Sequence, residues 1–278
     1  MNKKIYGKYL IFLLSVFVLF LVGSSKVSAA TDMSPEIEKI KSSGELKIAV
    51  PADDLVGFYE EDENGELKGL DIELAEGLAD SLGVKPKFVR IGGSFENMTK
   101  ALCDKEVDVI IGTFSRSYDR ASSIDFSKPY LSLRFGVMVN KKAMIKAKIK
   151  SNPIPYMKEN NVKISIMKGT SHVAMAKMLF PKATIVEVDS YDEADKMVKS
   201  GESFATFCSE AEFYSKYLEQ PDYSLYVSTY VFSDVKDDFV IAVNRDSQQL
   251  KTYADLYIDT KRPLTFSDVK EKYNEAFK

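Results

Sequence analysis

The pattern of apolar and polar residues predicts a first run of alternating strands and helices. Residues 46–50 alternate as a strand, and a helix with one apolar face opens at Asp71, which is placed to cap it, and ends at Gly83. The other ranges predicted here are helix 35–42, a tight turn at 64–65, strand 87–91, helix 94–105 and strand 107–111.

A second run repeats this pattern after an extended apolar segment at residues 131–139. Its predicted ranges are strands 162–167, 184–188, 204–208 and 239–243, helices 171–179, 191–199, 247–257 and 267–276, and an extended return at 226–232. Such alternation predicts parallel sheets with helices on both faces, which bind ligands at the carboxyl ends of the strands. Two α/β units joined by extended segments predict two lobes with a ligand cleft between them.

Small polar residues follow the buried strand 107–111. Thr113, Ser115 and Ser117 are followed by Arg120, a residue type whose guanidinium can hold a carboxylate with two hydrogen bonds. The alternative is an N-capping turn in which Ser117 starts a helix and Arg120 is solvated. From the spacing alone, the capping turn is the favoured interpretation.

Four motifs resemble those of the family-3 extracytoplasmic solute-binding proteins, the amino-acid-binding subunits of ABC importers. The positions of Ser115, Ser117 and Arg120 match the family's Thr-x-Thr-x-x-Arg, and residues 125–130 match its Asp-Phe-Ser-x-Pro-Tyr. Residues 63–71 and 168–171 resemble its Asn-Gly-x-x-x-Gly-Phe-Asp and Lys/Gln-Gly-Thr-Thr motifs.

The resemblance implies a type II periplasmic-binding-protein-like fold, in which two hinge strands join two lobes, each a mostly parallel sheet flanked by helices. It places the first lobe at residues 30–133 and 238–278 and the second at residues 134–237. It also implies that the ligand's carboxylate is clamped by Arg120. The other ligand contacts that it implies are Thr113, Ser115, Thr170, Ser171, Phe58 and Phe95. The residues themselves leave other interpretations open, because Thr170 and Ser171 also suit an ordinary helix cap and both phenylalanines also suit the core.

The sequence departs from the family where an aspartate usually meets the ligand's α-ammonium. Ser209 occupies that position, and the neighbouring acid is Glu210. Either Glu210 turns into the cleft and replaces the aspartate, or the ligand lacks a free ammonium. We favour Glu210.

The N-terminus has the pattern of a secretory signal peptide, residues 1–29, without a cysteine for lipid attachment near the cleavage site. Cleavage would change the formal net charge from −3 to −7, because residues 1–29 contain four lysines and no acid. An acidic chain with dispersed lysines argues against a nucleic-acid partner. Cys103 and Cys208 are expected to be free, buried thiols, and a single histidine, His172, excludes a histidine-rich metal site.

We therefore expect an extracytoplasmic, monomeric binding protein without cofactor or metal that delivers a small carboxylate-bearing solute, an amino acid, to an ABC permease. The sequence shows no activated nucleophile, so we expect no enzymatic activity. Two alternatives stay open: a dehydratase on the same scaffold, with Glu210 or Glu212 as general acid, and a ligand-sensing surface protein.

Overall fold

The computed structural model describes residues 33–261 and 264–273. Every helix and strand that it describes lies within the unit Pro35–Lys278. The predicted signal peptide, residues 1–29, lies outside the described residues. Among the described residues, no helix is both long enough and apolar enough to cross a bilayer.

The first half of this unit contains the predicted helices and strands, and it adds two short strands, β2 and β3, on either side of the predicted turn at 64–65. The elements of this half are α2 (Pro35–Ser43), β1 (Glu45–Pro51), β2 (Glu60–Glu61), β3 (Leu67–Lys68), α3 (Leu70–Leu82), β4 (Lys85–Ile91), α4 (Phe95–Cys103), β5 (Val109–Ile110) and α5 (Tyr118–Ala121). β1 pairs in parallel with both β4 and β5, which confirms the predicted parallel arrangement.

The second half repeats the arrangement. Its elements are α6 (Lys141–Lys146), α7 (Ile154–Glu159), β7 (Lys163–Met167), α8 (Ser171–Leu179), β8 (Thr184–Val188), α9 (Tyr191–Ser200), β9 (Ala205–Ser209), α10 (Glu210–Glu219) and the 3₁₀ turn η1 (Pro221–Leu225). β7 pairs in parallel with β8 and β9. The sequence patterns did not predict α6, α7 or α10.

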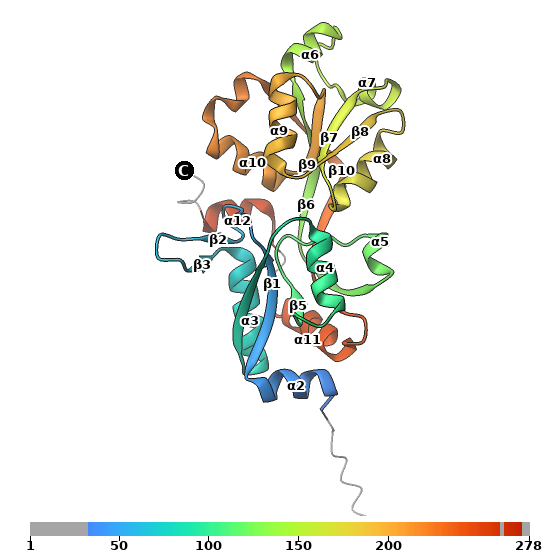
Figure 1. Ribbon diagram of the computed structural model, residues 1–278. Helices are drawn as coiled ribbons and strands as arrows, with labels where there is room; N and C mark the ends of the chain where they lie inside the picture. Colours follow the sequence, from blue (N-terminus) through green and yellow to red (C-terminus); the bar gives the residue numbers. More distant parts are fainter. Residues whose placement is uncertain (1–32, 262–263, 274–278) are drawn as a thin grey trace, which may run out of the picture. The chain divides into compact units, whose positions relative to one another are not determined.

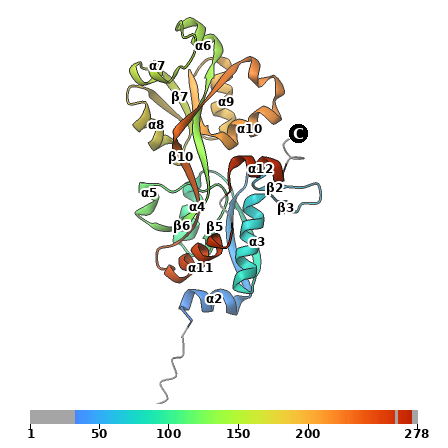
Figure 2. The ribbon, with the colours of Figure 1, turned by 180° about the vertical axis from the view of Figure 1, so that it is seen from behind.

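Two long antiparallel strands, β6 (Ile124–Asn140) and β10 (Val227–Asn244), run side by side through both halves (Figures 1 and 2). The sheet order is β4-β1-β5-β10-β6-β9-β7-β8, and α11 (Gln248–Asp259) and α12 (Phe266–Lys272) follow β10. This arrangement confirms the predicted α/β class with two connecting strands. The lobe boundaries at residues 133/134 and 237/238 stay a prediction.

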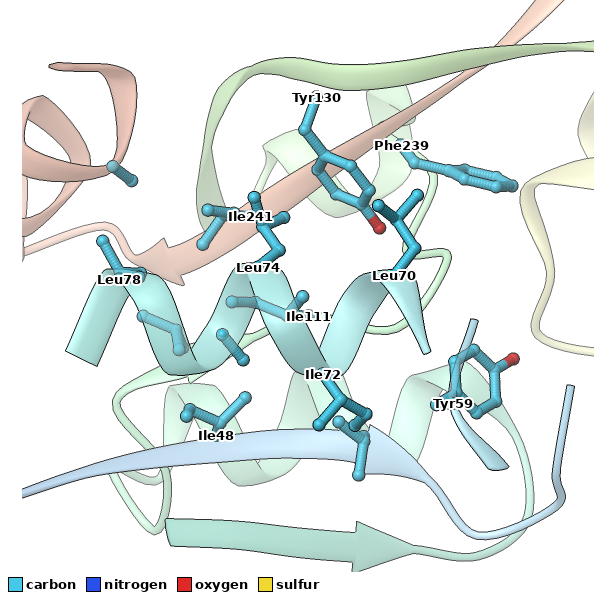
Figure 3. Packing of buried hydrophobic residues seen from close by; sticks show 14 of the residues in the cluster. Ile48, Tyr59, Leu70, Ile72, Leu74, Leu78, Ile111, Tyr130, Phe239 and Ile241 are labelled. Atoms are coloured by element: carbon cyan, nitrogen blue, oxygen red, sulfur yellow. The ribbon is translucent and has the colours of Figure 1, made fainter. Parts of the chain in front are cut away.

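The core of the first half is organised around α3. Figure 3 shows Leu70, Ile72 and Leu78 of α3 in one apolar cluster with Ile48 of β1 and Ile241 of β10. A separate cluster fills the second half, with members from β6, β7, α8 and β9. Each half thus buries its own apolar residues, and the two connecting strands, β6 and β10, contribute side chains to both clusters.

Two local expectations were wrong. The N-cap of α3 is Gly69, with φ 119°, and not Asp71. The N–H groups of Leu70 and Asp71 donate to the carbonyls of Gly57 and Phe58, and the Phe58 backbone passes so close that a Cβ at position 69 would clash with it. Asp71 instead lies inside the fold and is fully buried. Both cysteines are free, but only Cys208 is buried, since Cys103 is exposed at the end of α4.

Candidate functional site

A strained turn follows β5 at the carboxyl edge of the first half's sheet. Thr113 adopts φ 45°, a left-handed conformation that is costly for a β-branched residue. Its backbone N–H donates to Asp71 Oδ2 at 2.6 Å, and its hydroxyl lies 3.2 Å from the hydroxyl of Tyr59. Burial raises the pKa of Asp71 to about 7. The buried carboxyl therefore holds the turn that carries Thr113 and Ser115.

Arg120 lies in this turn and is only 9% exposed. Its guanidinium lies 4.1 Å from the ring centroid of Phe114, and Nη1 donates to the Ser115 carbonyl at 2.5 Å. Nη2 donates to the Gly169 carbonyl, in the second half of the unit, at 3.0 Å. Among the described residues, no carboxylate lies within ion-pair distance of Arg120. Burial lowers its pKa to about 10, which nearby Asp237 partly offsets, so the group is a buried cation at neutral pH.

The capping-turn interpretation of this segment describes part of the structure. Ser117 is the N-cap of α5, and its hydroxyl accepts from the Arg120 N–H at 3.3 Å. The capping turn is therefore present. Arg120 is nevertheless buried, so the solvated side chain that accompanied this interpretation is wrong.

The facing turn in the second half precedes α8. Thr170 is the N-cap of α8, and its hydroxyl donates to the Met167 carbonyl at 2.7 Å, whereas the Ser171 hydroxyl is buried without a described partner. Gly169 has φ 71°, and a Cβ on it would lie 2.6 Å from Cβ of Ser94. The two halves of the unit are thus in close contact at this glycine.

His172 connects the same turn to β10. Its Nε2 lies 3.2 Å from Asp237 Oδ2, and both side chains are almost fully buried. Its ring packs edge-on against Phe135, with centroids 5.3 Å apart. His172 therefore lies in the interior beside the Thr170–Ser171 turn, in contrast to the solvated position that a first-turn side chain usually has.

The two acids near the predicted ammonium position, Glu210 and Glu212, have different partners. The carboxylate of Glu210 accepts from the guanidinium of Arg134 and also from the backbone N–H of Arg134, the latter at 2.9 Å. Ser209 is the N-cap of α10 in a capping box with Glu212, which accepts from the backbone and the hydroxyl of Ser209. Burial raises the pKa of Glu212, and nearby His172 opposes that shift. The Ser-x-x-Glu spacing was the signal for this helix start.

The two predicted aromatic contacts have different surroundings. Phe58 is fully buried and stacks on Phe266, with centroids 6.5 Å apart, inside the first core. Phe95 starts α4, and its ring centroid lies 5.4 Å from the guanidinium carbon of Arg120. The structure thus brings Phe95 to Arg120 and places Phe58 among core residues. Their roles as ligand contacts stay predictions.

An acidic pocket with a volume of about 300 Å³ is lined by Glu212 together with residues of α9, α10 and the segment after β1. Its walls carry six carboxylates and one ammonium, that of Lys216, which pairs with three of the acids. Burial raises the pKa of Asp195 to about 6, although Lys216 opposes the shift. The lining acids are Asp53, Asp54, Asp192, Asp195, Glu212 and Glu219. Among the described residues, no cluster has the arrangement of a metal site.

This fold, with a buried arginine between two α/β halves that β6 and β10 connect, is that of a type II solute-binding protein. The sequence description of the bacterial extracellular solute-binding proteins, family 3, matches residues 36–276. The chain belongs to this family.

Three known proteins illustrate the similarity. The ABC transporter glutamine-binding protein GlnH of Bacillus subtilis is 26% identical over 80% of this chain and 81% of its own. The crystal structure of an ancestral amino acid-binding protein, a precursor of cyclohexadienyl dehydratase, has a TM-score of 0.67 and 25% identity, and covers 87% of this chain and 99% of its own. The arginine-bound ABC transporter substrate-binding protein AbpA of Streptococcus pneumoniae has a TM-score of 0.68, with 24% identity over 86% and 97% of the two chains, and shows the shared fold.

Proposed function

We propose that this solute-binding protein captures an amino acid by clamping its α-carboxylate on Arg120. The observation that carries the proposal is a buried guanidinium without a carboxylate partner among the described residues, whose nitrogens donate to carbonyls of both halves. A buried cation is costly unless an anion compensates it. A ligand carboxylate would provide that compensation and would draw the two halves together.

The groups around Arg120 suit the second oxygen of a carboxylate. Ser171 has a buried hydroxyl without a described partner, and the start of α8 offers backbone N–H groups with the positive end of the helix dipole. Thr113 and Ser115 lie on the opposite side, on the turn that Asp71 holds. These are the donors that a bound carboxylate needs after it has displaced the carbonyls from Arg120.

We assign the ligand's ammonium to Glu212 and not to Glu210. Glu210 is already neutralised by Arg134, whereas Glu212 lines the acidic pocket and has no cation partner within ion-pair distance among the described residues. Ser209, at the position of the family's aspartate, serves to fix Glu212 through the capping box. The replacement for the missing aspartate therefore comes from one helical turn further along the chain.

The acidic pocket favours an amino acid with a cationic side chain. Lys216 and, outside the pocket, Arg90 neutralise only part of the charge of the lining acids. A guanidinium or ammonium on the ligand's side chain would be attracted by these acids, whereas a carboxylate side chain would be repelled by them.

Isothermal titration calorimetry against a panel of L-amino acids tests both parts of the proposal. We expect arginine or lysine to bind more tightly than glutamine, and glutamate to bind worst. Arg120→Ala should abolish most of the affinity, while Arg245→Ala, which removes an exposed arginine, should leave it unchanged. If glutamine binds most tightly, the proposal of a cationic ligand side chain is wrong, but the proposal that Arg120 binds the carboxylate is unaffected. If Arg120→Ala binds as the parent does, the clamp is wrong.

Delivery of the ligand to an ABC permease, after export by the predicted signal peptide, completes the proposed function. A reconstituted importer assay with the partner permease would test it. The monomeric state remains a prediction that light scattering after size-exclusion chromatography measures directly.

One observation favours a second candidate function. Glu212 has a raised pKa and lies beside the proposed ligand site, as a general acid would. The structural relative that is a precursor of cyclohexadienyl dehydratase shows that binding and dehydration are close neighbours on this scaffold. Turnover of prephenate or arogenate that disappears in Glu212→Gln would establish a dehydratase, and tight binding without turnover would support the binding protein.

A further inference from the structure

A lysine-rich segment begins where β6 ends. Residues 141–158 contain six lysines and no acidic residue, in a chain whose formal net charge is −3. The function proposed above does not use this segment. β6 extends from Ile124 to Asn140, so α6 starts at the end of the strand remote from the Arg120 turn.

α6 carries three of these six lysines and is firmly attached to the second half. Asn140 caps the helix by accepting from the Ala143 N–H at 2.8 Å, and Met144 is buried in the core of the second half. Ile145, in contrast, is 75% exposed. Four lysines on α6 and just after it are exposed and form no ion pair with any described residue; they are Lys142, Lys146, Lys148 and Lys150. We call these four lysines and Ile145 the lysine face.

A second exposed apolar side chain lies on the segment beside this face. Lys141 donates from its backbone to the Tyr226 carbonyl at 2.9 Å and from its ammonium to the Ser224 carbonyl at 2.6 Å. Between those two residues, Leu225 is 70% exposed. Exposed Leu225 therefore lies near the start of α6, the helix that carries Lys142, exposed Ile145 and Lys146.

We propose that the lysine face docks the protein on an anionic phospholipid bilayer. Each lysine near an anionic lipid surface contributes about 1 kcal/mol of attraction, or about a 5-fold gain in affinity, and several together give measurable binding. Exposed isoleucine and leucine side chains add apolar contact with the acyl boundary. An anionic polymer would bind the lysines but would make no apolar contact with the isoleucine and leucine side chains. The acidic remainder of the chain would be repelled, so docking would have a single orientation.

Co-sedimentation with vesicles tests this proposal on residues 35–278, the unit that contains all described helices and strands. The vesicles are phosphatidylcholine alone or an equal mixture with phosphatidylglycerol. The variants are K142Q/K146Q/K148Q, I145S, and the matched control K39Q/K41Q/K47Q, which removes three exposed, unpaired lysines outside the lysine face.

We expect binding to the mixed vesicles only, with weaker binding as salt is raised. The triple lysine variant should lose on the order of 100-fold in affinity, I145S several-fold, and the control variant at most the small change of its altered net charge. Absence of binding to mixed vesicles, or equal losses in the control and the lysine-face variants, would overturn the proposal. The proposal would also be overturned if the protein bound soluble polyphosphate as tightly as the mixed vesicles and I145S did not weaken that binding. The lysine face would then be a binding surface for an anionic polymer.

Discussion

Gly169 provides a direct way to obstruct the contact between the two halves. Its carbonyl accepts from Arg120, and a Cβ added to it would lie 2.6 Å from Cβ of Ser94. Nonbonded carbon atoms normally stay about 3.5–4.0 Å apart, so Gly169→Ala requires the halves to separate by about 1 Å at this point. We call the arrangement in the structure, in which the halves touch at Gly169, the closed arrangement. The substitution should destabilise it while leaving each half folded.

The magnitude follows from two costs. Overpacking of this kind costs about 1–3 kcal/mol, and only the closed arrangement pays it. The backbone at φ 71° adds about 1–2 kcal/mol of strain in the open and closed arrangements alike. Since ligand affinity falls with the population of the competent arrangement, we expect a loss of about 5- to 150-fold in affinity.

Gly83→Ala is a matched control for the backbone strain. Gly83 ends α3 with φ 74°, almost the value at Gly169, and a Cβ there would meet no atom within 4 Å. Both variants should lose similar thermal stability without ligand, and only Gly169→Ala should lose affinity in calorimetry. Equal affinities for the two variants would refute the argument that closure at Gly169 accompanies binding.

Three further predictions concern the site and its support. Glu212→Gln should weaken amino-acid binding by about 10-fold or more, while Glu210→Gln should change it little, as calorimetry would show; the reverse order would restore Glu210 as the anchor. Burial holds the Asp71 pKa at about 7, above its unfolded value, so its contribution to stability is present below about pH 4 and is lost as pH rises through about 7. Thermal unfolding from pH 4.5 to 7.5 should therefore depend less on pH in Asp71→Asn than in the parent, and an unchanged pH dependence would contradict this. Small-angle scattering should show a smaller radius of gyration with saturating ligand, because β6 and β10 act as hinge strands; an identical profile at proven saturation would exclude closure.

The strands and most helices could be predicted because local periodicity determines them. Residues 184–188 form a strand with the predicted bounds, and Gly83 ends α3 as expected. Errors arose where long-range contacts decide the role of a residue. Asp71 looked like a helix cap, but the helix starts after Gly69, and Asp71 instead accepts from the backbone N–H of Thr113, 42 positions away.

The candidate site was only partly predictable for the same reason. The burial of Arg120 depends on Phe114 and on contact with Gly169, which lies 49 positions away in the sequence. The start of α10 did have a local signal, because Ser209 and Glu212 have the spacing of a capping box. The bidentate pairing of Glu210 with Arg134 had no local signal, since 76 positions separate the two residues.

Whether Arg120 holds the ligand's carboxylate can be measured with a thermodynamic double cycle in calorimetry. The parent and Arg120→Ala would each be titrated with the tightest-binding amino acid and with the amine that lacks only its carboxylate. We expect removal of the carboxylate to cost the parent about 2–5 kcal/mol, or roughly 30- to several-thousand-fold in affinity, and to cost Arg120→Ala almost nothing. An equal loss in both proteins would show that the carboxylate binds elsewhere.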